Sequence, residues 1–346
     1  MKLAVVLFNL GGPDSLDAVE PFLKNLFSDP AIISLPTPFR LPLAWFIAKR
    51  RTPVACAIYE HMGGRSPILP ETEAQARALE AALEKLGHTA KCFIAMRYWR
   101  PFTAEAAAAV KAYGPDAIVL LPLYPQYSTT TTGSSLAEWR KEAGRRGLSV
   151  PLHEVCCYPT HSGFAAAAAE LLRDALVHIK PGISYRVLFS AHGLPKRVVE
   201  KGDPYQHQVE QSVAAILSRL GQKGLDAVTC YQSRVGPLEW IGPATNEEIA
   251  RAGREGKGLI VFPVAFVSEH SETLVELDIE YAKLARETGV TDYIRVPAVR
   301  THPAFIEGLA ELVMSAVKAR EPVTCGTNRL CPKGRICGHK GAAPDA

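Results

Sequence analysis

The chain has 346 residues, of which 47% are apolar, 21% charged and 8% aromatic, and its formal net charge is +4. This balance excludes an intrinsically disordered chain, and the small charge argues against a nucleic-acid partner, which would need a strong basic stripe. No apolar run reaches the roughly 18 residues of a membrane-spanning helix, and at about 150 residues per domain the length predicts two domains. The first apolar segment, 3–10, lacks a signal-peptide cleavage site, so we expect a strand there and a cytoplasmic protein.

Strand-like and helix-like segments alternate along the chain, and this pattern occurs twice, near 1–155 and 160–320. The alternation predicts an α/β fold of parallel sheets with helices on both faces. Neither a G-x-G-x-x-G fingerprint nor a Walker lysine follows the first strand, which argues against nucleotide binding. Strands are predicted at 3–10, 90–96, 117–123, 185–190, 227–232, 258–266 and 293–296, and helices at 15–27, 71–86, 104–113, 164–179, 206–220, 246–252, 272–286 and 303–319.

Polar residues that suit metal or proton chemistry follow two of the predicted strands. His192 comes directly after 185–190, and a neutral imidazole there can accept a proton or bind a divalent transition metal. His270 precedes a helix on which Glu272, Glu276 and Glu280 share one face. Like charges at this spacing repel, so the acidic face is either solvated or relays protons or a hydrated divalent metal such as ferrous iron.

The segment from Thr129 to Ser135 is rich in hydroxyl side chains and follows a predicted strand and Tyr124. Taken alone, it is most simply a polar loop. Its hydroxyls have the chemistry to hydrogen-bond a carboxylate or the backbone.

A second unusual segment, residues 35–51, reads LPTPFRLPLAWFIAKRR. Its aromatic and aliphatic residues flanked by basic ones favour a membrane interface or an apolar lip around a ligand. The alternative is a core helix with a basic end, which the prolines at 36, 38 and 42 weaken.

Three of the eight cysteines crowd into the glycine-rich C-terminal segment. Three thiols in so short a tail predict ligation of zinc or an iron–sulfur cluster, and both need a fourth ligand from elsewhere. The tail cysteines are Cys325, Cys331 and Cys337, and the candidates for the fourth ligand are Cys156, Cys157 and, less favoured, His339.

Several segments occur together in a specific order and spacing. They are Asn9–Pro13, Gly63–Pro67, Leu123–Ser128 with Thr132–Ser135, Ser190–Pro195, Val235–Pro237 with Trp240–Pro243, Pro263–Leu274 and Leu277–Tyr281. Together they resemble the ferrochelatase family, and the match covers nearly the whole chain. Each segment alone is a modest signal, but their combination is highly specific.

The resemblance implies a chelatase-like fold of two similar Rossmann-like halves, over 1–158 and 159–322, with an active-site cleft between them and a tail over 323–346. It implies that His192 is the essential histidine facing the macrocycle, with His270 and Glu272 on the opposite wall of the cleft. The resemblance implies substrate binding by Arg97, Tyr98, Trp240 and Leu10, and we expect Tyr124, in a matching segment, to join them. Together with the acidic face of the helix, the resemblance leads us to expect metal binding by His192, Glu272, Glu276 and Glu280.

By this resemblance the chain is expected to be a lyase that inserts ferrous iron into protoporphyrin IX, the last step of haem biosynthesis. We expect His192 to accept pyrrole protons while iron arrives past His270 and Glu272; the reverse assignment stays open, because imidazole performs either task. The alternatives are a chelatase for coproporphyrin or for cobalt-binding sirohydrochlorins, and a non-catalytic haem or iron carrier.

Family members with a C-terminal cysteine tail carry a 2Fe–2S cluster, so the resemblance implies this cofactor here, held by Cys157 and the three tail cysteines. Animal enzymes place the fourth cysteine where this chain has Thr129, and Cys156 remains the alternative to Cys157. The other expected partners are the porphyrin, ferrous iron and, through residues 35–51, the surface of the inner membrane. A monomer and a homodimer are both compatible with the sequence.

Overall fold

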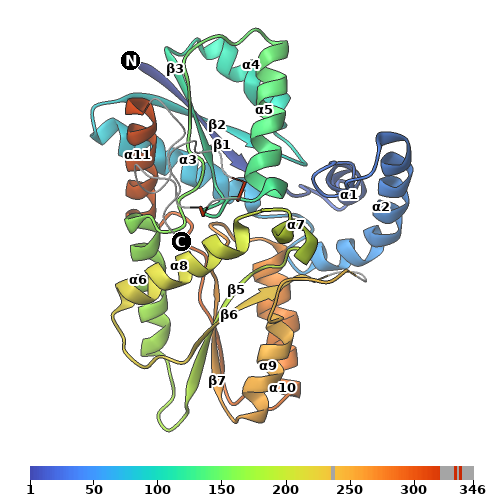
Figure 1. Cartoon of the computed structure of the whole chain (residues 1–346), viewed down its shortest axis with the longest axis vertical. Coiled ribbons are helices and arrows are strands. Elements are labelled where there is room, and N and C mark those ends of the chain that lie inside the picture. The colour runs from blue at the N-terminus through green and yellow to red at the C-terminus, as the bar shows by residue number, and fades with distance from the viewer. Residues whose placement is uncertain (235–237, 320–330, 333–334, 337–346) are drawn as a thin grey trace. The chain divides into compact units, whose positions relative to one another are not determined.

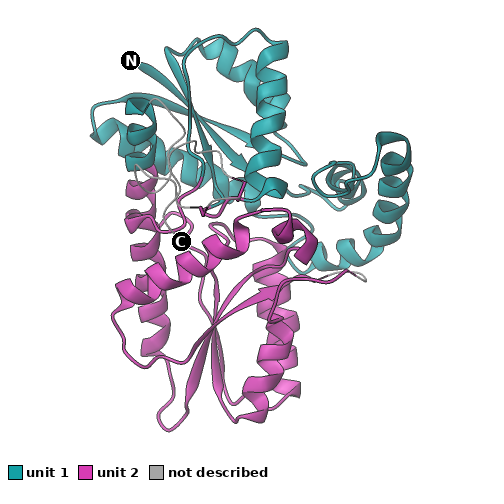
Figure 2. Ribbon diagram, in the orientation of Figure 1, with its two compact units in different colours: residues 1–124, 128–156, 310–323 teal, residues 125–127, 157–309, 324–346 magenta. Residues whose placement is uncertain are grey.

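The computed structural model describes residues 1–234, 238–319, 331–332 and 335–336. The chain divides into two compact units, shown in different colours in Figure 2. Unit 1 comprises residues 1–124, 128–156 and 310–323, and unit 2 comprises residues 125–127, 157–309 and 324–346. The units are therefore not simply consecutive halves of the chain, because the last helix, α11 (Pro303–Lys318), begins in unit 2 and ends in unit 1.

Unit 1 is built on a parallel sheet with the strand order β2-β1-β3-β4 (Figure 1). Residues 3–8 of the central strand β1 are almost fully buried, as expected for an apolar run without alternation in a sheet covered on both faces. The strands are β1 (Lys2–Asn9), β2 (Thr89–Met96), β3 (Ala117–Pro122) and β4 (Leu152–Glu154), and the helices are α1 (Val19–Phe27), α2 (Thr37–Glu60), α3 (Ile68–Lys85), α4 (Thr103–Tyr113), η1 (Thr129–Gly133) and α5 (Ser134–Arg145).

Unit 2 repeats this arrangement with the strand order β6-β5-β7-β8, again all parallel. The predicted α/β fold with two parallel sheets is thus confirmed. The strands are β5 (Tyr185–His192), β6 (Ala227–Gln232), β7 (Gly258–Pro263) and β8 (Tyr293–Arg295), and the helices besides α11 are α6 (Ser162–Val177), α7 (Lys196–Glu200), α8 (Tyr205–Leu220), α9 (Thr245–Arg254), η2 (Glu272–Tyr281) and α10 (Ala282–Glu287).

Helix α2 shows that prolines near its start do not prevent a helix. Pro38 lies in the first turn, where a backbone N–H has no partner within the helix, and Pro42 removes one hydrogen bond of the next turn. Only Ala44, Ala48 and Tyr59 of this helix are buried. The segment is therefore helical, but it is not a core helix.

Two segments differ from the sequence expectation in their local geometry. The hydroxyl-rich segment is not a loop: it forms the π-helix η1, capped by the Ser128 side chain, and continues into α5, which the sequence did not predict. The helix predicted over 272–286 begins as the π-helix η2 and becomes α-helical only at α10. Because π-helical turns are rare and cluster at functional sites, η2 draws attention to its first residues.

Among the residues that the structure describes, no helix is both long enough and apolar enough to cross a bilayer.

Candidate active site

The carboxyl end of the sheet in unit 2 carries the histidine that the sequence singled out. His192 is the last residue of β5 and pairs in register with Gln232 at the end of β6. The chain then turns at Gly193, whose N–H bonds to the Gln232 carbonyl. A Cβ at Gly193 would lie 2.9 Å from that carbonyl oxygen and 3.2 Å from the Trp240 ring, so this close approach requires glycine.

His192 and Glu272 form a direct hydrogen bond. The Nδ1 atom of His192 lies 2.7 Å from Oε2 of Glu272, the first residue of η2. When the imidazole is neutral, this carboxylate selects the tautomer with the proton on Nδ1, which leaves Nε2 as an acceptor. The His192 side chain is 40% exposed, so the ring remains accessible to a ligand.

Glu276, one turn further along η2, is joined to Glu272 through Ser233. The Ser233 hydroxyl lies 2.9 Å from Oε2 of Glu272 and 2.5 Å from Oε2 of Glu276. Glu276 also accepts hydrogen bonds from the Gln232 amide, the Ser233 N–H and the Tyr281 hydroxyl. Ser233 itself has a φ of 60°, a left-handed conformation that non-glycine residues seldom adopt.

The titratable groups of this cluster shift one another's pKa values, lowering that of Glu272 and raising those of His192 and Glu276. Burial alone would raise the pKa of Glu272, but the charge and hydrogen bond of His192 lower it to about 2. The partial burial of His192 would lower its pKa, but the charge and hydrogen bond of Glu272 raise it above its usual value. Burial and the negative charge of Glu272 both raise the pKa of Glu276. Opposed shifts within one small cluster are typical of groups that take part in proton transfer.

His270 lies close enough to this cluster for its charges to act on the ring, and one face of the ring contacts an aromatic side chain. Its ring packs against Phe266 with centroids 4.5 Å apart, and the side chain is buried. Burial lowers the pKa of His270, so the imidazole stays neutral near pH 7. Nδ1 has no hydrogen-bond partner among the described residues, so a lone pair or an N–H is available there.

The expectation that His192 faces His270 and Glu272 from the opposite wall of a cleft is wrong. His192 and Glu272 are hydrogen-bonded neighbours, and all three residues belong to unit 2. The motif match had assigned them to opposite walls of the cleft. Parallel pairing of β5 with β6 and β7 brings the ends of these strands to one edge of the sheet.

The four residues predicted as metal ligands do not form one compact group. Glu280 is exposed, whereas Glu276 is partly buried. Across the described parts of the chain, no set of three or more His, Cys, Asp or Glu side chains has the arrangement of a metal site.

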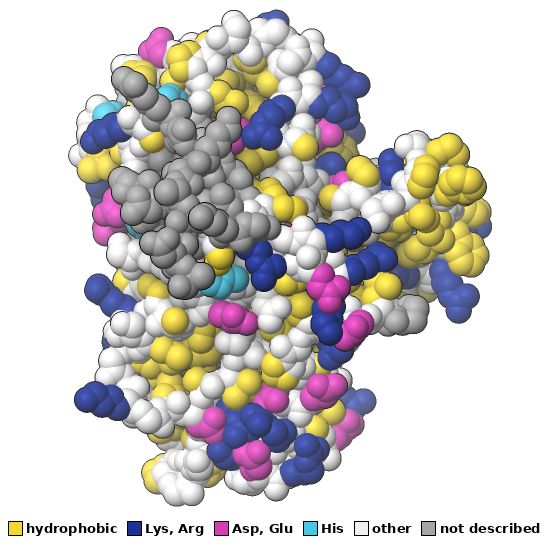
Figure 3. All heavy atoms as spheres, viewed as in Figure 1, with side chains coloured by type: hydrophobic (Ala, Val, Ile, Leu, Met, Phe, Trp, Pro, Cys, Tyr) yellow, Lys and Arg dark blue, Asp and Glu magenta, His cyan; other side chains and the backbone are white. Residues whose placement is uncertain are grey.

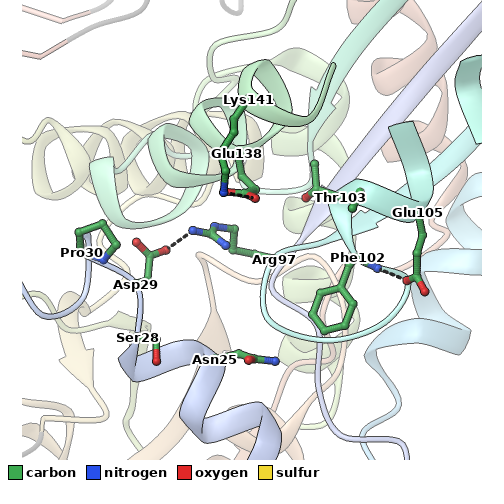
Figure 4. A pocket seen from close by; sticks show the side chains of 11 residues that line it. Asn25, Ser28, Asp29, Pro30, Arg97, Phe102, Thr103, Glu105, Glu138 and Lys141 are labelled. Atoms are coloured by element: carbon green, nitrogen blue, oxygen red, sulfur yellow. Dashed lines mark hydrogen bonds and ion pairs between the residues drawn. The ribbon is translucent and has the colours of Figure 1, made fainter. Parts of the chain in front are cut away.

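In unit 1, Arg97 and Tyr98 follow the end of β2 and are fixed by Asp29. One oxygen of this buried carboxylate lies 2.7 Å from Nη2 of Arg97, 2.8 Å from the Tyr98 hydroxyl and 2.5 Å from the Ser134 hydroxyl. Figure 4 shows Asp29 and Arg97 at a cavity of about 490 Å³ that also contains the Glu138–Lys141 ion pair. The charges around this cavity are largely paired with one another, so Arg97 is held in one position.

The remaining predicted substrate-binding residues lie at strand ends of both units. Leu10 follows β1 and its carbonyl accepts the Tyr98 N–H, while Tyr124 lies just beyond β3. Trp240 pairs with Pro195 next to the turn at Gly193 and therefore lies near His192.

The structure describes two of the four cysteines that are predicted to bind the cluster. Cys157 and Cys331 are both fully buried, and their sulfur atoms lie 3.3 and 3.1 Å from the side-chain nitrogen of Gln208. Cys325 and Cys337 lie outside the described residues.

Four residues with central positions were not predicted from the sequence. Gln232 ends β6 and Ser233 follows it. Their position at the carboxyl end of a predicted strand was the sequence feature that could have identified them. Tyr281 ends one of the motif segments, but neither it nor Asp29 could be given a role, because their partners Glu276 and Arg97 are defined only by the tertiary structure.

The fold is shared with solved structures of chelatases. Two structures of the sirohydrochlorin chelatase SirB from Bacillus subtilis, one with Fe3+ and one in complex with cobalt, match with TM-scores of 0.53 and 0.54. They cover 92% of this chain and 95% and 96% of their own lengths, at 14% and 13% identity. At this identity the likeness shows the fold alone, and that fold is of the chelatase class.

The family follows from the sequence comparisons. A family model described as Ferrochelatase matches residues 2–317. Proteins named Ferrochelatase from Caulobacter vibrioides and Phenylobacterium zucineum are 57% and 56% identical over 318 and 334 residues. These matches cover 91% and 96% of this chain and 90% and 96% of the relatives. The chain belongs to the ferrochelatase family, as its motifs predicted.

Proposed function

We propose that this protein inserts ferrous iron into a porphyrin to form haem, acting as a lyase of the metal chelatase type. The observation that carries the proposal is the hydrogen-bonded set of His192, Glu272 and Glu276 at the strand ends of unit 2. Family membership supports the same reaction.

Metallation requires a base, because the two pyrrole N–H groups of the porphyrin must lose their protons. His192 supplies it: Glu272 holds Nδ1–H, so the Nε2 lone pair accepts the proton. The Glu272 carboxylate then stabilises the imidazolium, as its effect on the pKa of His192 requires. The proton passes from this pair toward Glu276, whose raised pKa makes it the better proton acceptor of the two glutamates.

Ferrous iron, the second substrate, must shed water before it enters the ring. His270 is suited to bind it in transit, because burial keeps its imidazole neutral and neutral imidazole is a ligand for ferrous iron. Glu272 adds a carboxylate two residues away. We assign proton transfer to His192 and iron delivery to His270.

The assay that tests this function mixes the purified protein anaerobically with ferrous iron and either protoporphyrin IX or coproporphyrin. We expect multiple turnovers of metalloporphyrin, faster with protoporphyrin IX. Faster insertion into coproporphyrin would reverse the substrate assignment. Stoichiometric haem binding without turnover would instead identify a carrier and contradict the proposal.

The His192→Ala variant separates the two histidine roles. We expect iron binding, measured without porphyrin, to persist while insertion stops. Loss of iron binding in His192→Ala, with retention in His270→Ala, would establish the reverse assignment.

We also propose that α2 binds the surface of a membrane. Figure 3 shows hydrophobic side chains gathered over this helix, and Phe39, Trp45 and Phe46 are about half exposed or more. Lys49, Arg50 and Arg51 follow them on the same helix and are exposed. Aromatic side chains beside basic ones match the chemistry of an anionic lipid surface.

Flotation with lipid vesicles tests this surface. We expect the protein to float with anionic vesicles, and a Phe39→Ser/Trp45→Ser/Phe46→Ser variant to stay behind. Val177→Ser is the matched control, because Val177 is an exposed apolar residue on α6. Equal flotation of all three proteins would contradict the proposal.

We further propose that Cys157, Cys325, Cys331 and Cys337 hold a 2Fe–2S cluster. The residues present fit such a group: Cys157 and Cys331 are 174 positions apart, yet both are fully buried and contact the same amide nitrogen. This contact favours Cys157 over Cys156 as the fourth ligand. A bound cluster would act as a one-electron centre.

The visible spectrum of the freshly purified protein tests the cluster. We expect charge-transfer absorption that disappears in Cys157→Ser and persists in Cys156→Ser. A colourless wild-type protein containing no iron or inorganic sulfide would contradict the assignment.

A further inference from the structure

A single glutamine connects the two described cysteines of the predicted cluster to a distant backbone segment. Gln208 lies in the first turn of α8 and is fully buried. Its Nε2 atom lies 3.3 Å from Sγ of Cys157 and 3.1 Å from Sγ of Cys331. Its Oε1 atom accepts the Tyr127 N–H at 2.7 Å. All four residues belong to unit 2.

The orientation of this amide is fixed by its partners. A backbone N–H can only donate, so the group facing Tyr127 must be the amide oxygen. The NH₂ group therefore faces the sulfur atoms, and its two hydrogens match the two sulfurs in number. All of the hydrogen-bonding groups of the buried Gln208 side chain are thus used.

Two N–H donors directed at two sulfurs suit ligands that carry negative charge. A thiol is a weak acceptor, whereas a metal-bound thiolate is a much better one, and a hydrogen bond to a charged group is stronger than a neutral one. Because both sulfur atoms are fully buried, the amide dipole offsets part of this charge. Its effect grows when the cluster gains an electron and its sulfurs become more negative.

We propose that Gln208 is a positioning residue that donates two N–H···S hydrogen bonds to Cys157 and Cys331 and thereby raises the reduction potential of the cluster they bind. This inference rests on the proposed cluster and is independent of the proposed iron insertion. The same side chain ties these sulfurs to the backbone of Tyr127.

An anaerobic redox titration of the purified protein, followed by visible absorption and electron paramagnetic resonance, tests the inference. Gln208→Glu keeps an acceptor for Tyr127 but cannot donate when ionised, and Gln208→Met removes both functions. In both variants we expect the ratio of reduced to oxidised cluster at a fixed ambient potential to fall about tenfold, which corresponds to a potential lower by about 59 mV. Gln206→Met is the control. Gln206 lies on the same helix, but its amide donates an exposed hydrogen bond to the Glu210 side chain.

The outcomes separate the possible failures. Variants that bind a full cluster with an unchanged potential would overturn the inference. A potential lowered equally in Gln206→Met would overturn it too, since the effect would then not depend on the N–H···S bonds. A colourless wild type that still inserts iron would overturn the cluster and this inference, but not the proposed function. A wild type that shows the cluster spectrum but no turnover would overturn the proposed function, but not the cluster. If Gln208→Met fails to fold, Gln208→Glu carries the measurement.

Discussion

The two units have the same sheet but carry different chemistry at its carboxyl edge. The strand orders β2-β1-β3-β4 and β6-β5-β7-β8 correspond strand for strand. In unit 1 the strand-end cation Arg97 is neutralised by Asp29, and the Asp29 oxygen also accepts hydrogen bonds from two hydroxyl groups. In unit 2 the strand-end residue His192 lies in a cluster of groups with shifted pKa values. The same sheet places side chains at its carboxyl edge in both units. The residues at the strand ends decide whether those side chains are held in charge-neutral pairs or have shifted pKa values.

The largest effect is expected from a substitution at the carboxyl edge of the sheet in unit 2. His192→Ala removes the base, so we expect turnover to fall by about 10³-fold, within the range for loss of general acid–base catalysis. Turnover measured with porphyrin at saturation checks this. His302→Ala, at a histidine that pairs with Glu170 on α6, should retain turnover close to wild type. Retained activity in His192→Ala would contradict the role of this edge.

The next effect should come from the partner of that base. Glu272→Gln removes the negative charge that raises the pKa of His192, so the imidazole becomes a weaker base and turnover should fall about 100-fold. The base must be unprotonated, so in the wild type the rate falls as the pH drops through the raised pKa of His192. In Glu272→Gln this acid limb should move to lower pH.

The pH profile has a matched control on α10, which continues η2. Glu287→Gln changes an exposed glutamate and should leave both the rate and the acid limb as in the wild type. An acid limb that stays in place in Glu272→Gln would show that another group controls it.

A smaller effect is expected at Ser233, whose hydroxyl links the two glutamates. Ser233→Ala and Ser233→Gly both remove this hydroxyl, and we expect turnover to fall about tenfold in each. The left-handed backbone at this position favours glycine, so the Gly variant should be more stable than the Ala variant by about 1 kcal/mol. Chemical denaturation and initial rates measure the two effects separately. Wild-type rates in Ser233→Gly would refute a role for the hydroxyl.

The smallest effect on turnover should come from Asp29, which fixes Arg97 at the carboxyl edge of the sheet in unit 1. Asp29→Asn leaves the Arg97 charge without its buried partner, so the free energy of unfolding should fall by about 3 kcal/mol. Turnover per folded molecule should stay within about threefold of wild type. Glu105→Gln, which breaks an exposed pair with Arg100, should change neither quantity measurably. A large loss of turnover at full stability would place Asp29 in the reaction itself.

The alternation of strands and helices was readable from the sequence because it depends on local patterns of apolar residues. The buried runs of β1, β3 and β7 and their parallel pairing match the prediction. Local patterns did not reveal α2 as an exposed helix, because the burial of a helix depends on which other segments pack against it in the folded chain. They also did not reveal the π-helical turns of η1 and η2, because helical periodicity alone does not separate the two hydrogen-bonding registers.

The sequence by itself determined the family, the paired parallel sheets and the strand-end position of His192, because motifs and apolar periodicity are properties of neighbouring residues. The tertiary structure alone decided that His192 contacts Glu272, that Ser233 links Glu272 to Glu276, and that Gln208 contacts two sulfurs. These partners are separated by 39 to 123 positions in the chain. Their contacts follow from strand pairing and packing, which no short stretch of sequence specifies.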